Sequence, residues 1–109
     1  DEIRLLHKQL ANNLLKNLDI VEKLSFEDVW CHVYKKENDT LVWEKSCQNG
    51  TSHTFDPPTE LLVKCMSEND DFFIWTRYNS RILCNIVQNE EFVVVVCTPL
   101  RGGIVNFLF

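Results

Sequence analysis

The chain has 109 residues and a mass of 12.8 kDa, the size of a single domain. Hydrophobic residues make up 45% and charged residues 25%, which excludes intrinsically disordered, collagen-like and low-complexity proteins. The formal charge is −5, no basic stripe offsets it, and no apolar run reaches the roughly 18 residues that cross a bilayer. We therefore expect no nucleic-acid partner and no membrane span. The apolar run 105–109 at the end favours one domain, residues 1–109, cut from a longer protein.

Residues 2–24 have the spacing of an amphipathic helix. Seven apolar residues recur at intervals of three or four positions: Ile3, Leu6, Leu10, Leu14, Leu18, Val21 and Leu24. This pattern predicts a helix over residues 1–25 that packs on a sheet. Asp19 and Glu22 have the spacing of a capping pair, so a kink near Asn17 is an open alternative.

From Val29 onward, β-branched and aromatic residues dominate, and turn residues interrupt them about every ten positions. The expected strands are 29–36, 40–47, 50–55, 60–67, 71–78, 81–88, 91–98 and 103–109. Asn49-Gly50 is the strongest hairpin signal. No connection looks long enough for the helical crossover that parallel strands need, so the sequence predicts antiparallel pairing.

The later strands, 71–78, 81–88 and 91–98, are apolar on both faces and therefore need cover on both faces. The helix can cover one face, and the other requires a sheet that curls over itself or a partner. The predicted fold class is α+β. It consists of one long N-terminal helix on a curved, mostly antiparallel meander of seven or eight strands, residues 28–109, with a barrel as its closed form. Strand 91–97 is expected at the centre of the sheet.

The cysteines indicate the redox compartment. All five lie within expected strands: Cys31, Cys47, Cys65, Cys84 and Cys97. An odd number without CxxC spacing favours buried free thiols, and hence an intracellular protein of the cytoplasm or nucleus. The glycosylation sequons at Asn38 and Asn49 support the opposite alternative, a secreted domain with disulfides.

No residue pattern indicates an active site. A zinc site would need Cys31, His32, Cys47 and His53, but Cys31 and His32 would point to opposite faces of one strand. A Cys–His nucleophile would need a helix N-terminus or a glycine elbow beside it, and neither is present. The sequence therefore predicts no catalytic residue, no metal and no cofactor.

The leading hypothesis is a non-enzymatic protein-interaction or scaffold domain, a subunit of a larger intracellular complex. It would bind another protein or a second copy of itself through an apolar sheet face or the helix. The expected anchors are Trp30, Phe73 and Trp75 on strands, with Leu5 and Leu15 on the free face of the helix. The first alternative is a β-barrel that binds a small apolar ligand, and the second is the secreted glycosylated domain.

Overall fold

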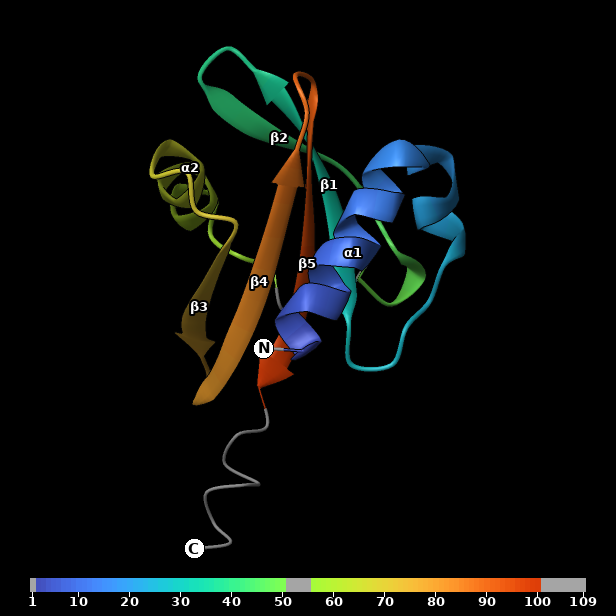
Figure 1. Ribbon diagram of the computed structural model, residues 1–109, viewed down its shortest axis with the longest axis vertical. Helices are drawn as coiled ribbons and strands as arrows, with labels where there is room; N and C mark the ends of the chain where they lie inside the picture. Colours follow the sequence, from blue (N-terminus) through green and yellow to red (C-terminus); the bar gives the residue numbers. More distant parts are fainter. Residues whose placement is uncertain (1, 51–55, 101–109) are drawn as a thin grey trace, which may run out of the picture.

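The computed structural model describes residues 2–50 and 56–100. Its elements are α1 (Glu2–Lys16), the 3-10 helix η1 (Leu18–Lys23), β1 (Trp30–Glu37), β2 (Thr40–Ser46), the 3-10 turn η2 (Gln48–Gly50), α2 (Thr59–Ser67), β3 (Phe72–Arg77), β4 (Ser80–Gln88) and β5 (Phe92–Leu100). Within this part of the chain, five strands form one open antiparallel sheet in the order β2-β1-β5-β4-β3 (Figure 1). The fold is α+β with an N-terminal helix, as predicted, and β5 is the central strand.

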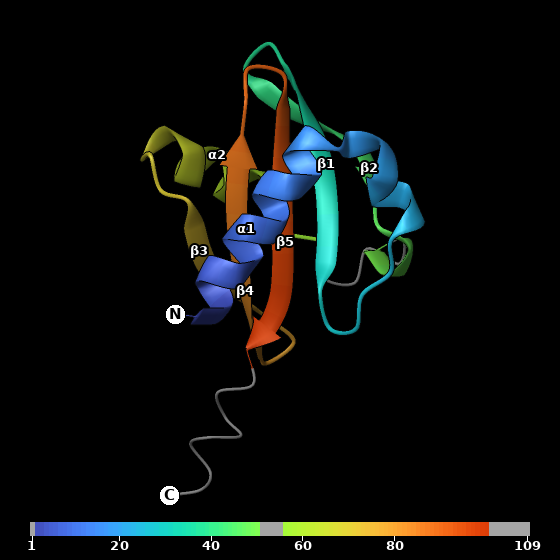
Figure 2. The same ribbon diagram turned by 45° about the vertical axis from the view of Figure 1, so that its right-hand side comes forward.

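The two helices cover opposite faces of the sheet. α1 crosses β4 and β5 on one face (Figure 2), and α2 lies on the other face beside β2. The buried side chains of the first face, the α1 cluster, are Ala11, Leu14, Val21, Cys31, Val33, Cys47, Val87, Val94 and Val96. Those of the second face, the α2 cluster, are Tyr34, Leu41, Leu62, Cys65, Ile82, Cys84, Ile86, Val93, Val95 and Cys97. This double cover explains why β4 and β5 are apolar on both faces.

The described residues form five strands and do not support the predicted seven or eight. The expected strand 60–67 is helix α2. Leu62 and Cys65 are buried, three positions apart, as on one face of a helix. Pro58 precedes the helix in extended conformation, with φ −60° and ψ 135°, and its fixed φ suits a chain that is about to turn helical. Gly50 belongs to η2, and the rest of the expected strand 50–55 lies outside the described residues, as does the expected strand 103–109.

The sheet is open, so the barrel prediction is also wrong. β2 and β3 are its two edges, and a barrel would require these strands to pair with each other. The connection 47–71, which holds α2, carries the chain from one edge to the other. The predicted meander is confirmed for β3, β4 and β5, in which strands consecutive in sequence are neighbours in the sheet. β1 departs from it, because it lies between β2 and β5.

The N-terminal helix is shorter than predicted. α1 ends at Lys16, and Asn17 leaves helical geometry with φ −137° and ψ 58° while its Nδ2 donates to the Asn13 carbonyl at 2.9 Å. η1 follows, so the alternative of a kink near Asn17 is what the structure shows. Ile3 and Leu6, expected on the buried face, are 53% and 61% exposed, because the face of α1 that meets the sheet is centred on the buried Ala11 and Leu14.

Candidate functional site

The outer side of β3 has main-chain hydrogen-bonding groups that no neighbouring strand pairs among the described residues, although the Phe72 carbonyl accepts from the Cys65 thiol at 3.6 Å. Among the described residues β3 pairs with β4 alone, and the Ile86 N–H donates to the Asp71 carbonyl at 2.9 Å. Main-chain groups alternate in direction along an antiparallel strand, so Phe73, Trp75 and Arg77 also bond toward β4. The alternate residues therefore turn their N–H and C=O groups outward, and these residues are Phe72, Ile74 and Thr76. Such a row can bond an added strand.

Exposed apolar side chains lie beside this row. Ile74 is 43% exposed and Ile3 of α1 is 53% exposed. Both line a groove of about 190 Å³ whose other walls are Arg4, Phe72, Leu83 and Leu100. We call the outward groups of β3, together with the side chains of Ile3, Ile74 and Tyr78, the β3 edge surface.

The hairpin between β3 and β4 adds a strained aromatic residue. Tyr78 and Asn79 both have positive φ, 50° and 65°, as in a type I′ turn. Asn suits this conformation, whereas a bulky residue such as tyrosine is strained in it. The Tyr78 side chain is 80% exposed, and the Arg77 guanidinium lies 5.0 Å from its ring centroid. The Tyr78 ring is therefore an exposed aromatic group at the end of β3.

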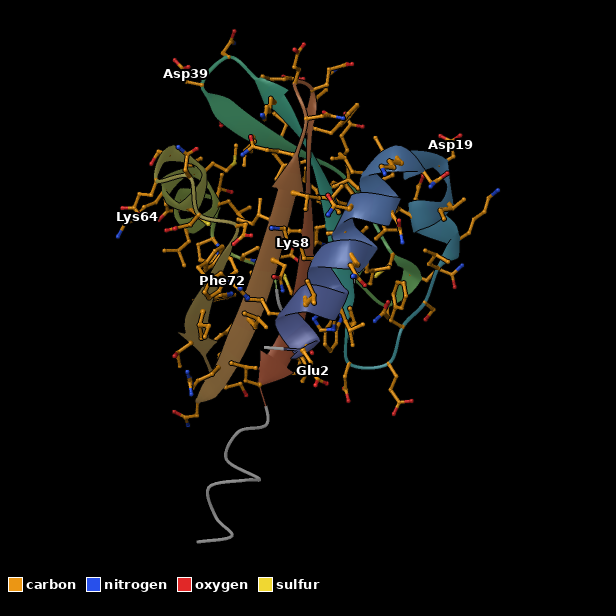
Figure 3. All side chains as sticks on the ribbon, in the orientation of Figure 1. Glu2, Lys8, Asp19, Asp39, Lys64 and Phe72 are labelled. Carbon is orange, nitrogen blue, oxygen red and sulfur yellow. The ribbon has the colours of Figure 1, made fainter. Side chains whose placement is uncertain are left out.

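Charged side chains connect α1 to the start of β3. Lys8 bonds Asp71 through Nζ and Oδ2, and Arg4 Nη1 lies 3.9 Å from Asp71 Oδ1. The Lys8 hydrogen bond, with the nearby positive charges of Lys8 and Arg4, lowers the pKa of Asp71. The Arg4 guanidinium also stacks 4.3 Å from the ring centroid of Phe72, which Figure 3 labels together with Lys8. These contacts hold the N-terminal half of α1 against the β3 side of the sheet.

A buried polar bridge joins β1, β2 and Asp56, and no motif in the sequence predicts it. His32 Nδ1 lies 2.7 Å from Ser46 Oγ, and His32 Nε2 lies 3.1 Å from Asp56 Oδ1. The Trp43 indole N–H donates to the same Ser46 oxygen at 2.8 Å. The arrangement that uses every donor has the Ser46 hydroxyl donating to His32 Nδ1 and the His32 Nε2–H facing Asp56.

The chemical groups of this bridge are those of a hydrolase triad, but they are arranged to join segments of the chain. Ser46 is only 5% exposed and its oxygen already has two partners, so a substrate carbon has no room beside Oγ. His32 is fully buried. The bridge therefore links β1, β2 and the segment leading into α2.

A β-bulge brings the bridge together. Strict alternation predicts that Trp43 and Ser46 lie on opposite faces of their strand. The pairing of β1 with β2 shifts between Val33 and Tyr34, which leaves Glu44 as the extra residue of β2. Trp43 and Ser46 consequently share one face. Nothing in the sequence of β2 indicates this shift.

Asn49 is a structural residue and does not form the predicted hairpin. Its Nδ2 donates to the carbonyls of Phe26 and Val29, both at 2.7 Å. Its Oδ1 accepts from the Phe26 N–H at 3.2 Å and from the Cys47 thiol at 2.8 Å. N-glycosylation modifies Nδ2, which already uses both of its protons here. The second sequon residue, Asn38, is exposed in the turn between β1 and β2.

The five cysteines are buried free thiols in the structure. Cys31, Cys84 and Cys97 lie in strands, whereas Cys47 follows β2 and Cys65 lies in α2. Burial raises the pKa of Cys65 to about 11 and raises that of Cys97 as well. A hydrogen bond with Cys47, and then burial, raise the pKa of Cys31. Thiols with raised pKa values ionise little and are weak nucleophiles.

The five expected anchors lie in different environments. Phe73 and Trp75 of β3, and Trp30 at the start of β1, are half-buried against the α2 cluster. Leu5 is 57% exposed on α1. Leu15 packs against the α1 cluster and is therefore not on the free face of the helix. β3 is thus the one element that brings two anchors together.

No group of three or more His, Cys, Asp or Glu side chains in the described ranges could hold a metal ion, and His53 lies outside those ranges. Within residues 2–50 and 56–100, no helix has both the length and the apolar character needed to cross a membrane. No model of a known protein family matches the chain, and no curated protein matches it.

Proposed function

We propose that the chain is a non-enzymatic protein-interaction domain that binds a partner strand along β3, as a subunit of a larger intracellular complex. The observation that carries this proposal is the chemistry of the β3 edge. Edge strands usually carry charges or bulges that prevent further pairing. β3 has neither between Phe72 and Thr76, and its outward groups lie beside exposed apolar side chains. The buried free thiols support a reducing, intracellular environment.

A second copy of the chain is the partner that fits this edge. The outward residues Phe72, Ile74 and Thr76 are symmetric about Ile74, so two antiparallel β3 strands can pair with Ile74 on a two-fold axis. Two hydrogen bonds then form at each of three residue pairs. The same register places Phe73 opposite Trp75 in both halves, and aromatic cross-strand pairs are favourable. The two expected anchors of β3 thus lie against each other across the axis.

The test compares one exposed β-branched residue on each edge of the sheet. Ile74 of β3 is 43% exposed and Val42 of β2 is 40% exposed. We expect Ile74→Lys to weaken self-association by about 100-fold or more, because two ammonium groups then meet at the axis. Val42→Lys should leave association unchanged. Sedimentation equilibrium measures both dissociation constants, and circular dichroism confirms that both variants fold.

Two results would contradict the proposal. A wild-type chain that stays monomeric at every concentration rules out the second copy as partner. Equal weakening by Ile74→Lys and Val42→Lys places the interface elsewhere than on β3.

A further inference from the structure

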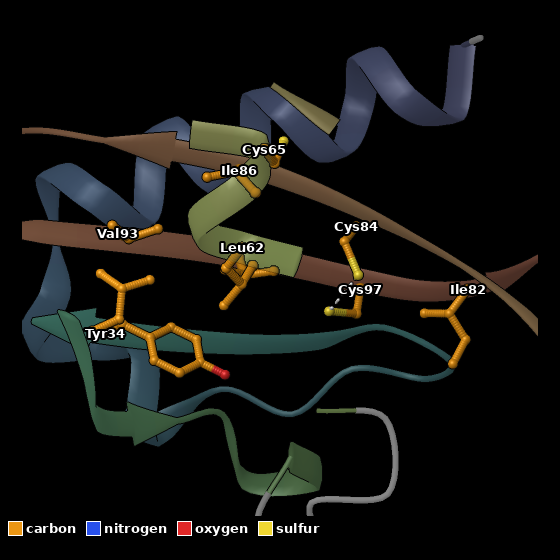
Figure 4. Close-up of a cluster of buried hydrophobic side chains, with 10 residues drawn as sticks. Tyr34, Leu62, Cys65, Ile82, Cys84, Ile86, Val93 and Cys97 are labelled. Atoms are coloured by element: carbon orange, nitrogen blue, oxygen red, sulfur yellow. Dashed lines mark hydrogen bonds between the residues drawn. The ribbon is translucent and has the colours of Figure 1, made fainter. Parts of the chain in front are cut away.

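Cys84 and Cys97 face each other across two neighbouring strands. They are direct partners in the pairing of β4 with β5, and their sulfur atoms lie 3.4 Å apart (Figure 4). Both belong to the α2 cluster and are fully buried. A disulfide needs the sulfurs to approach to about 2.05 Å.

The hydrogen bonds of the sheet determine which kind of antiparallel residue pair Cys84 and Cys97 form. Ile86 bonds toward β3, and by alternation Cys84 does too. The Lys36 N–H donates to the Glu91 carbonyl at 2.8 Å, so the odd-numbered residues of β5, including Cys97, bond toward β1. Cys84 and Cys97 are therefore a non-hydrogen-bonded pair. In such pairs the Cα atoms lie about 4.5 Å apart, within the range of roughly 4.4–6.8 Å that a disulfide spans.

The chain offers an internal comparison in Cys31 and Cys47. These residues also lie close together, because the Cys47 N–H donates to the Cys31 carbonyl at 3.0 Å, but Cys47 follows the last residue of β2. The Cys47 sulfur has other partners, since it accepts from the Cys31 N–H at 3.2 Å and donates to Asn49 Oδ1 at 2.8 Å. Cys65 bonds main-chain carbonyls after α2.

We propose that Cys84 and Cys97 are a disulfide-forming modification site, oxidised by a small aliphatic disulfide of the glutathione class when the β4–β5 hairpin opens. One protein thiolate attacks the small disulfide, so that a mixed disulfide forms and one small thiolate leaves. The second protein thiolate then attacks the protein sulfur of that mixed disulfide. The Cys84–Cys97 bond forms and the second small thiolate leaves. The protein pair loses two electrons and two protons, and the small disulfide is reduced to two thiols.

Burial controls the rate of this reaction rather than its product. Both thiols are inaccessible in the closed sheet, so the oxidant reaches them during folding or local opening. Sub-denaturing urea should therefore accelerate oxidation. The product joins the central strand to β4 across 13 positions of sequence.

The test exposes the full chain to mixtures of oxidised and reduced glutathione, with and without sub-denaturing urea. We expect the intact mass to fall by two hydrogens, with three of the five thiols still open to alkylation. Peptide mapping should place the bond between Cys84 and Cys97. Cys84→Ala should abolish the closed product, whereas Cys31→Ala, the matched buried-thiol control, should leave it intact.

Peptide mapping of the wild type gives a result even where a variant does not fold. A bond that maps to other cysteines overturns the proposal, as does a wild type that keeps five thiols in the most oxidising mixture with urea. A stable glutathione adduct on Cys84 without closure also overturns it. If urea does not change the rate of oxidation, the oxidant does not reach the thiols through opening of the β4–β5 hairpin, and that part of the proposal is wrong.

Discussion

The two edges of the sheet are built in opposite ways. β2 has a bulge at Glu44, an ion pair in which Lys45 Nζ lies 3.5 Å from Glu22 Oε1 of η1, and a last residue held in the polar bridge. β3 is regular and apolar, and it meets α1 mainly through its first residues. Both strands have one free side among the described residues, so the difference lies in their side chains. It teaches that local chemistry, rather than position in the fold, distinguishes an edge with features that block further pairing from an edge without them.

The largest expected effect is on the β2 side and comes from Asn49→Ala. This substitution removes the amide that bonds Phe26 and Val29, and it leaves their main-chain groups without that partner. We expect the free energy of unfolding to fall by about 3 kcal/mol, as measured by urea denaturation. The loop before β1 would then be held less firmly to the end of β2. The β2 edge should become less constrained, and so differ less from the β3 edge.

The matched control is Asn12→Ala, which changes an exposed asparagine on α1. Alanine favours helix, so stability should stay the same or rise slightly. Equal losses for both variants would mean that the Asn49 hydrogen bonds contribute nothing beyond the general effect of the substitution.

Thr76→Pro should affect association more than stability. The Thr76 N–H faces away from β4, so proline removes a donor that the monomer does not use. We expect self-association to weaken about 10- to 30-fold, because two bonds related by the two-fold axis are lost. The free energy of unfolding should change by less than about 1 kcal/mol.

Trp75→Pro is the contrasting variant for this prediction. The Trp75 N–H bonds toward β4, so proline there should destabilise the monomer itself by about 3 kcal/mol. If the two proline variants lose the same stability, the direction assigned to the β3 main-chain groups is wrong.

The smallest expected effect concerns the ion pair at the start of β3. Lys8 lowers the pKa of Asp71 in the folded chain, so the pair stabilises the fold above the ordinary aspartate pKa of about 3.9. This contribution is lost as the pH falls through the lowered pKa. Because both side chains are about 40% exposed, Lys8→Met should lower stability at pH 7 by less than about 1 kcal/mol.

Urea titrations at a series of pH values measure this difference, with Lys16→Met as the control for an exposed lysine of α1. The wild type and Lys8→Met should converge in acid. A difference that persists below the lowered pKa of Asp71 would indicate loss of packing around the lysine stem rather than loss of the ion pair.

The sequence was sufficient to predict elements whose signals are local. The expected strands 29–36, 40–47, 71–78, 81–88 and 91–98 match β1 to β5 within one or two residues at each end. Their turn residues and β-branched runs decide these positions without help from the rest of the chain. The central place of β5 also follows from its uninterrupted apolar run.

The features that the sequence did not predict have a different origin, because each depends on contacts between residues that are distant in sequence. Residues 60–67 form a helix because Leu62 and Cys65 pack on the sheet. Asn49 bonds residues 20 and 23 positions away, and the bulge at Glu44 exists only relative to β1. The candidate site was predicted in part: Phe73 and Trp75 lie on the β3 edge strand, but no sequence pattern shows that β3 is an edge.

The strand order affects how the nascent chain can fold during translation. β1 and β2 leave the ribosome early and can form a hairpin at once, but the other side of β1 pairs with β5, which is made after the other four strands that the structure describes. The sheet is completed by inserting β5 between β1 and β4. Such long-range closure is slow, and until it occurs the apolar side chains of β1 are without their cover. An apolar strand face that stays open until the last described strand is made is prone to aggregation during synthesis.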